Sequence, residues 1–204
     1  MPSTRMLHPH GRQCLMFTSV NTFKNQRTGP RRILLPWLLL GIFMIISASA
    51  TATNTPIAPT ATYTDTHGQT VSTATLKGHA SMVWLLSTWC RSCSAGLSSL
   101  NAHVDQLRAS GLHVVILRTY QNGGVTGPDI ASFVAQNAPA LMKANVSLGE
   151  ATQGLERVYN PRHYPDIYYL IDANGRIQTV DTAPSITLNK ILDFAKAHAG
   201  ESRP

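Results

Sequence analysis

The chain has 204 residues, which is enough for one domain of ordinary size and an appended segment. It contains 17 Lys and Arg against 10 Asp and Glu, but six of the basic residues and none of the acidic ones lie within residues 1–50. Residues 51–204 therefore carry 11 basic and 10 acidic side chains, and they contain no basic cluster. This distribution argues against nucleic acid as a partner, because a nucleic-acid-binding domain carries its positive charge as a patch on the folded part.

Residues 33–50 have the pattern of a secretion signal. Two arginines precede an uncharged apolar run at 33–46, and small residues follow it at 47–50. An apolar run with its basic flank at one end is expected to insert with that end in the cytoplasm. We therefore predict a basic cytoplasmic leader at residues 1–32 and a signal peptide or membrane anchor helix at 33–50. The remainder is placed on the periplasmic or extracytoplasmic side of the membrane, anchored or secreted.

Residues 51–62 are rich in Thr, Ala and Pro and are typical of a linker. From Tyr63 to residue 200 the pattern is that of one folded domain. In chain order, we predict a hairpin with turns at 65–68 and 75–78, a strand at 82–86, a helix ending before Gly111, a strand at 112–117, helices at 129–137 and 150–159, strands at 167–171 and 176–180, and a helix at 186–198. Strands that alternate with helices predict a mixed α/β sheet covered on both faces.

Cys90 and Cys93 are the only cysteines after the apolar run, since Cys14 lies in the leader. They lie between the predicted strand at 82–86 and the helix that follows it. A cysteine that begins a helix lies near free backbone N–H groups and the positive end of the helix dipole, which favour its thiolate. Cys90 is thus the predicted attacking thiol, and Cys93 resolves the mixed disulfide by forming a redox disulfide with it.

Two inert alternatives for the cysteine pair are weaker. A structural disulfide that closes a loop of two residues restricts little chain entropy and stabilises little. A zinc site needs two further ligands, and the sequence has neither a second C-x-x-C nor a close histidine pair. We therefore expect no bound metal and no cofactor besides the dithiol itself.

Four stretches of the sequence carry a specific resemblance when they are taken in order. They are 65–71 with 76–78, Ser87–Cys93, Leu155–Tyr159 and Tyr164–Ile177, with Pro165 placed 72 residues after Cys93. Together they resemble the thioredoxin superfamily, and within it the exported, often membrane-tethered TlpA-like proteins. The resemblance implies a thioredoxin-like fold, with a mixed central sheet flanked by helices and an N-terminal β-hairpin extension.

The resemblance also implies roles for residues around the dithiol. The Tyr164–Pro165 bond is expected to be cis, with Pro165 against the dithiol and the Tyr164 backbone free to pair with a substrate strand. Trp89, Tyr164 and Pro165 then form the substrate groove. Arg91 adds a positive charge beside Cys90, which is expected to favour the thiolate and a more oxidising couple.

The sequence departs from its relatives at three positions. Thioredoxin has a buried Asp six residues before the first cysteine, where this chain has Trp84, so the usual proton acceptor for Cys93 is absent and water or another group must replace it. Many relatives have a Glu and a Pro early in the active-site helix, where this chain has Gly96 and Ser98. A weaker first turn and a helix without a proline kink are expected.

The resemblance implies a protein thiol-disulfide oxidoreductase. TlpA-like proteins often keep the cysteines of apocytochromes or oxidase-assembly proteins reduced, so reduction is the expected direction, and the oxidising direction stays open because of Arg91. The implied partners are exported proteins with thiols or disulfides, and a membrane protein that supplies electrons. A copper-binding metallochaperone is the alternative of another class, with His163 as the third ligand beside the two thiols, although copper-delivering relatives usually space their cysteines by three residues.

Overall fold

The computed structural model describes residues 55–201. The predicted leader and the predicted signal or anchor helix lie outside these residues. Within the described part, no helix combines the length and the apolar character that a membrane crossing needs.

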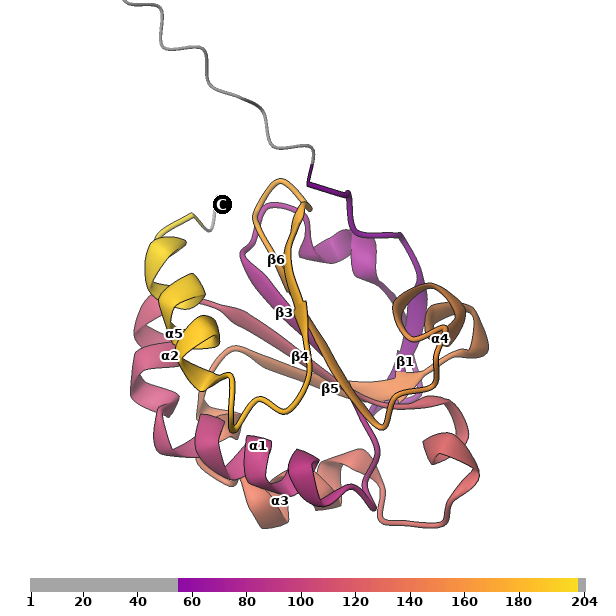
Figure 1. The fold of residues 1–204 in the computed structure, drawn as a ribbon. Helices are drawn as coiled ribbons and strands as arrows, with labels where there is room; N and C mark the ends of the chain where they lie inside the picture. Colours follow the sequence, from indigo (N-terminus) through magenta and orange to yellow (C-terminus); the bar gives the residue numbers. More distant parts are fainter. Residues whose placement is uncertain (1–54, 202–204) are drawn as a thin grey trace, which may run out of the picture. The chain divides into compact units, whose positions relative to one another are not determined.

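A seven-stranded mixed sheet in the order β2-β1-β5-β4-β3-β6-β7 forms the centre of the domain (Figure 1). Its strands are β1 (Thr62–Asp65), β2 (Thr70–Ser72), β3 (Ser81–Leu86), β4 (His113–Arg118), β5 (Val146–Ala151), β6 (Asp166–Ile171) and β7 (Ile177–Asp181). β3, β4 and β5 run parallel, and every other neighbouring pair is antiparallel. The predicted α/β class and the thioredoxin-like arrangement are confirmed.

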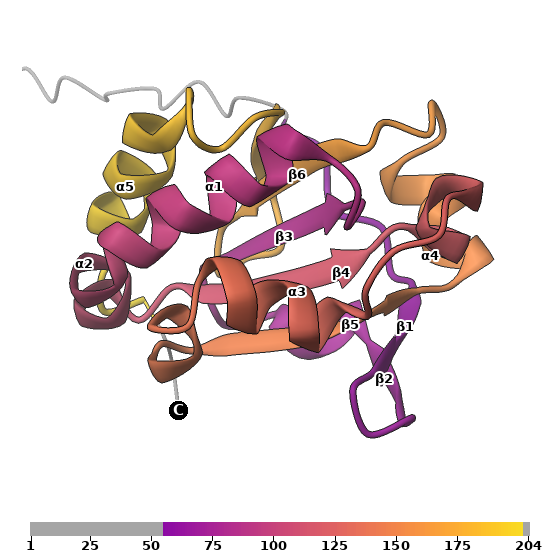
Figure 2. The same cartoon turned by 90° about the horizontal axis from the view of Figure 1, so that it is seen from below.

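Helices cover both faces of this sheet. They are α1 (Arg91–Ala102), α2 (Val104–Ser110), α3 (Ile130–Asn137), α4 (Gln153–Tyr159) and α5 (Leu188–Ala197), with short 3-10 segments at Thr73–Leu76, Tyr120–Gly124 and Leu141–Lys143. α1, α2, α3 and α5 pack on one face, while α4 lies apart from them (Figures 1 and 2). α4 shares the second core cluster with side chains of β1, β3 and β4.

All six residues of β3 are buried, because the strand lies in the middle of a sheet with two covered faces. Met82, Trp84 and Leu86 belong to the core on the side of α1, whereas Val83 and Leu85 belong to the core on the side of α4. The strand predicted at 82–86 is confirmed. In β6, Tyr168 and Tyr169 are likewise both buried, one in each core.

The helix predicted at 150–159 is wrong in its first part. Residues Val146–Ala151 form β5, and α4 begins only at Gln153, with the Thr152 hydroxyl accepting a hydrogen bond from the Leu155 N–H. Gly149 sits in the middle of β5 because β1 passes close to it: a Cβ there would collide with the carbonyl oxygen of Thr64. The pairing of β5 with its neighbours therefore overrides the local helical pattern.

Two further differences concern element boundaries. The helix after the cysteines continues past Ser98 without a break, as expected in the absence of proline, and is interrupted instead at His103, which separates α1 from α2. At the N-terminus, part of the predicted linker lies against the domain. The Ala58 N–H donates to the Gly175 carbonyl, and the Ile177 N–H donates to the Pro56 carbonyl, both at 2.8 Å.

Candidate dithiol active site

The two cysteines lie where β3 passes into α1. Cys90 has extended backbone angles and is the N-cap residue, and Cys93 lies in the first turn of the helix. Both thiols are free, so the structure represents the reduced form. Cys90 retains 7% of its surface and Cys93 retains none, which makes Cys90 the sulfur that a substrate can reach.

The first turn of α1 carries no acidic side chain. The positive end of the helix dipole is therefore not neutralised by a neighbour on its own element. Arg91 starts the helix with its side chain exposed. Its effect on Cys90 stays a prediction.

Pro165 lies against the dithiol. Its carbonyl oxygen accepts hydrogen bonds from the Ser87 N–H at 2.8 Å and from Cys93 Sγ at 3.2 Å. These bonds tie the loop before β6 to the turn that holds the cysteines. The expected cis geometry of the Tyr164–Pro165 bond stays a prediction.

The Tyr164 backbone is not free in the way the resemblance implied. The Tyr164 N–H donates to Asn160 Oδ1, and the Tyr164 carbonyl accepts from Asn160 Nδ2, each at 2.8 Å. A carbonyl has a second lone pair, but the single N–H is already used. A substrate strand therefore finds the carbonyl available and the N–H occupied by Asn160.

A small groove lies beside the dithiol, with a cavity volume of about 110 Å³. It brings together Trp89, Tyr164 and Pro165, the three residues predicted for it, and adds Tyr120. Trp89 is held by a hydrogen bond from its Nε1 to the Asn122 carbonyl at 2.8 Å. The sequence offers no signal for Tyr120, since it lies in the separate 3-10 segment after β4.

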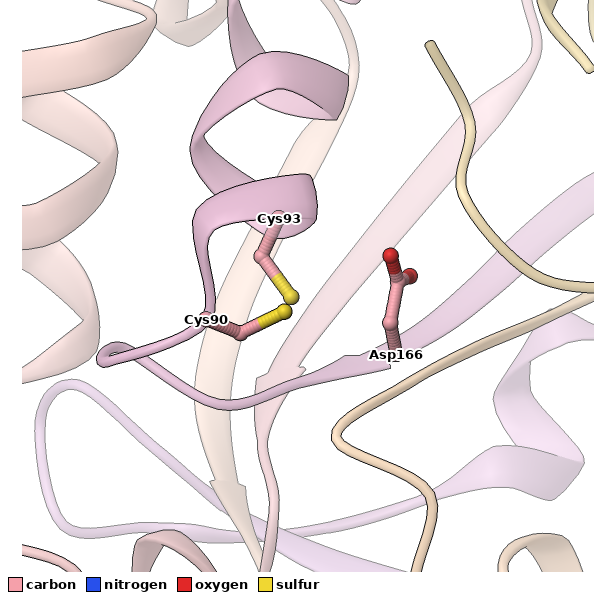
Figure 3. A group of neighbouring side chains, drawn as sticks. All are labelled: Cys90, Cys93 and Asp166. Atoms are coloured by element: carbon pink, nitrogen blue, oxygen red, sulfur yellow. The ribbon is translucent and has the colours of Figure 1, made fainter. Parts of the chain in front are cut away.

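Sequence reasoning missed Asp166, the first residue of β6. Only 5% of its surface is exposed, and its carboxylate lies beside the two cysteine sulfurs (Figure 3). The two sulfurs and a carboxylate oxygen lie within 4.8 Å of one another. An acidic residue directly after Pro165 at the start of a buried strand was the available signal.

Trp84 and Ser92 hold the Asp166 carboxylate. Trp84 Nε1 donates to Oδ1, and the Ser92 hydroxyl donates to Oδ2, both at 2.8 Å. Asp166 lies opposite Leu86 in the antiparallel pair of β6 and β3, so the carboxylate reaches the dithiol from the neighbouring strand. Trp84 occupies the position at which thioredoxin has its Asp. In this chain the carboxylate comes instead from Asp166 on the neighbouring strand β6.

This surrounding changes the chemistry of Cys93. Burial raises the pKa of its thiol strongly, and the negative charge of Asp166 and a hydrogen bond with Cys90 raise it further. Cys93 is therefore held as a thiol at neutral pH and must lose its proton to a nearby group before it can attack.

A family model described as AhpC/TSA matches residues 56–180. The chain belongs to the AhpC/TSA family. A comparison with curated proteins finds no match. The family match begins at residue 56, in agreement with the backbone bonds that attach Pro56 and Ala58 to the β6–β7 hairpin.

Solved structures with the same fold accompany this family assignment. A putative thiol:disulfide interchange protein DsbE from Chlorobium tepidum is 22% identical, with a TM-score of 0.53 over 69% of this chain and 96% of that one. A putative protein disulfide isomerase from Bacteroides thetaiotaomicron is 16% identical, with a TM-score of 0.53 over 70% and 87%. BsSco, a member of the Sco family of cytochrome c oxidase assembly proteins, is 15% identical, with a TM-score of 0.53 over 71% and 94%. These likenesses confirm the thioredoxin-like fold, and the predicted enzyme class, protein thiol-disulfide oxidoreductase, agrees with them and with the AhpC/TSA family.

The copper alternative does not fit this AhpC/TSA-family site as it was predicted. Within residues 55–201, the one group of ligand-type side chains close enough to meet a single ion is Cys90, Cys93 and Asp166. His163 is not part of it, since its ring is largely exposed and lies 3.6 Å from Glu156 Oε1. Copper prefers sulfur and imidazole ligands, and the carboxylate oxygens here already accept hydrogen bonds.

Proposed function

We propose that the protein exchanges disulfides with other proteins through Cys90 and Cys93. The observation that carries this proposal is the pair of free thiols at the start of α1, one with residual exposure and one fully buried, with Pro165 bonded to the buried one. Residues 55–201 contain no other cysteine, so neither thiol has another disulfide partner within this part of the chain.

The reaction in the reducing direction has two steps. The Cys90 thiolate attacks one sulfur of a substrate disulfide, which forms a mixed disulfide and releases a substrate thiolate that takes up a proton. Cys93 then gives up its proton, attacks Cys90 Sγ and releases the second substrate thiol. Two electrons and two protons pass to the substrate, and a Cys90–Cys93 disulfide remains.

Asp166 is the group placed to receive the Cys93 proton. It is the nearest carboxylate to both sulfurs among the described residues, and a buried thiol has little access to water. The proton then passes to the departing substrate sulfur, so the carboxylate ends the cycle ionised. In this role Asp166 replaces the aspartate that thioredoxin has at the position of Trp84.

We further propose that the domain works outside the cytoplasm and reduces exported proteins. The support for this location is the basic leader and the uncharged apolar run at 33–46. The likeness to a putative thiol:disulfide interchange protein from Chlorobium tepidum supports the disulfide exchange itself. Clients in cytochrome c or oxidase assembly fit this location, and a membrane protein would have to resupply electrons. The oxidising direction is the second candidate, and Arg91 with the acid-free first turn of α1 favours it.

The test is disulfide exchange by the full chain in mild detergent, in a Cys14→Ser background that leaves only the two active-site thiols. Reduction of insulin by dithiothreitol should be accelerated by this protein and not by its Cys90→Ser variant. The Cys93→Ser variant should accumulate mixed disulfides with insulin, visible on non-reducing gels. If the protein with both thiols is no faster than Cys90→Ser, the proposed function is wrong.

A further inference from the structure

Two opposite influences act on the dithiol from different elements. The N-terminal end of α1, with no acidic side chain in its first turn, favours negative charge on Cys90. Asp166 approaches from β6 and opposes negative charge on either sulfur, because the ligand atoms of all three lie within 4.8 Å of one another. The balance between them decides how strongly the dithiol form is stabilised.

The Asp166 carboxylate is buried without a compensating cation. Within residues 55–201, no Lys, Arg or His side chain forms an ion pair with it, and its two hydrogen-bond donors, Trp84 and Ser92, are neutral. A buried charge without a counterion acts over short distances with little screening. A second negative charge on a neighbouring sulfur is therefore disfavoured.

Ser92 extends this influence to Cys90. Its hydroxyl lies 3.0 Å from Cys90 Sγ and donates to Asp166 Oδ2 at 2.8 Å. A serine hydroxyl has one hydrogen, so Ser92 can only accept from Cys90 while it donates to Asp166. The Cys90 sulfur must then keep its own hydrogen to complete the chain. As long as Asp166 is ionised, this hydrogen-bond chain favours Cys90 as a thiol.

Few other titratable groups among the described residues lie near the hydrogen-bond chain of Cys90, Ser92 and Asp166. Cys93 faces this hydrogen-bond chain from α1. Tyr168, two residues after Asp166 in β6, interacts with the Asp166 carboxylate electrostatically. Glu156 and His163 line the small groove together with Pro165. Among these groups, only Asp166 lies within 4.8 Å of both sulfurs.

We propose that Asp166, directly at Cys93 and through Ser92 at Cys90, sets this dithiol to act as a reductant rather than an oxidant. The inference rests on the proposed dithiol exchange and assigns its direction. A thiolate stabilises the reduced form and makes a couple more oxidising, whereas the disulfide carries no charge for Asp166 to act on. By suppressing the thiolates, Asp166 and Ser92 withhold that stabilisation from the reduced form. Asp166 opposes the oxidising tendency expected from Arg91 and the helix dipole.

The test is the equilibrium of the full chain, in the Cys14→Ser background, with glutathione. Two glutathione thiols reduce the Cys90–Cys93 disulfide to two thiols and leave as one glutathione disulfide. Asp166→Asn keeps the shape of the side chain and an acceptor for Trp84 but removes the charge. We expect it to shift the equilibrium constant by about tenfold towards the reduced protein. Asp166→Ser, a second neutral variant, should shift it in the same direction.

The same glutathione equilibrium serves for the control variant and for the test of whether Asp166 acts on Cys90 through Ser92. Asp172→Asn makes the same substitution at the other end of β6, where the carboxylate bonds to the hairpin backbone, and should leave the equilibrium unchanged. In a Ser92→Ala background the shift caused by Asp166→Asn should be smaller, because the path to Cys90 is cut.

The outcomes separate this inference from the function beneath it. A reversible couple that neither neutral variant shifts, or that they shift towards the disulfide, overturns the role of Asp166 and leaves dithiol exchange standing. If the unsubstituted protein gives no reversible two-electron couple with glutathione, the proposed function fails, and the inference fails with it.

Discussion

The Trp84 side chain lies directly against Gly96, and the large residue at one position requires the small residue at the other. A Cβ on Gly96 would lie 2.9 Å from Trp84 Cη2, so the indole fills the room that a side chain in the first turns of α1 would need. The same indole donates to Asp166. Two departures from the relatives, a Trp for an Asp and a Gly for a Glu, are therefore parts of one arrangement that holds the carboxylate of β6.

This fit predicts the effect of adding one methyl group. Gly96→Ala should lower the free energy of unfolding by about 1–3 kcal/mol, because the buried Trp84 ring would have to shift to admit the added methyl group. Gly154→Ala, in α4, is the matched control, because its new methyl would meet only Thr152 Oγ1 at 3.8 Å. It should be neutral or stabilise by about 0.5–1 kcal/mol. Urea denaturation of both variants measures the difference, and equal effects would contradict the proposed fit.

At the scale of elements, one side chain organises the loop between α4 and β6. Asn160 is the C-cap of α4 and is fully buried. Its amide bonds to both backbone groups of Tyr164 and, at 2.7 Å, to Glu156 Oε1. The loop that carries Pro165 to the dithiol is thereby anchored to the end of the preceding helix.

Removing this amide should loosen the proline loop. Asn160→Ala should leave the buried Glu156 with one partner fewer and lower the free energy of unfolding by about 1–3 kcal/mol. Hydrogen exchange at the Tyr164 amide should accelerate, because its acceptor is gone. Asn189→Ala, at an exposed position of α5, should change neither quantity. Unchanged exchange at Tyr164 in Asn160→Ala would show that the loop is held by other contacts.

At the scale of the whole molecule, the sheet joins two cores built from different parts of the chain. β4 and β5 are central to it, and His113 Nε2 lies 2.8 Å from the Ser147 hydroxyl across this pair. Burial lowers the pKa of His113 below its usual 6.5, and the nearby His79 lowers it further. The folded state thus disfavours the protonated imidazole more than the unfolded state does.

The sign of the resulting pH dependence follows from linkage. Above about pH 7.5 the imidazole is neutral in both states, and the full stability is present. As the pH falls through 6.5, the unfolded state takes up a proton more readily, and stability is lost. His113→Gln should reduce this loss, measured by urea denaturation between about pH 8 and pH 5. His67→Gln, in the exposed β1–β2 turn, should leave the slope as it is. A slope that His113→Gln leaves unchanged would assign the pH dependence to other groups.

Local patterns in the sequence were enough for most elements. The apolar run at 82–86, the cysteines before a helical repeat and the turn Asp172–Gly175 each carry their own signal, and the structure has the corresponding strand, helix start and hairpin. The helix predicted at 150–159 was wrong at its start, because Glu150 pairs with Arg118 of β4 and the preceding Gly149 lies closely against Thr64 of β1.

The sequence by itself determined the fold class and the position of the dithiol, because hydrophobic periodicity and cysteine spacing are properties of neighbours along the chain. Only the tertiary structure revealed the buried acid. Asp166 lies 73 residues after Cys93 and reaches it because β6 pairs antiparallel with β3, with Trp84 and Ser92 as its donors. The pairing of these two neighbouring strands places the Asp166 carboxylate beside the sulfurs, whereas the segment before the cysteines has Trp84 at the position of the thioredoxin aspartate.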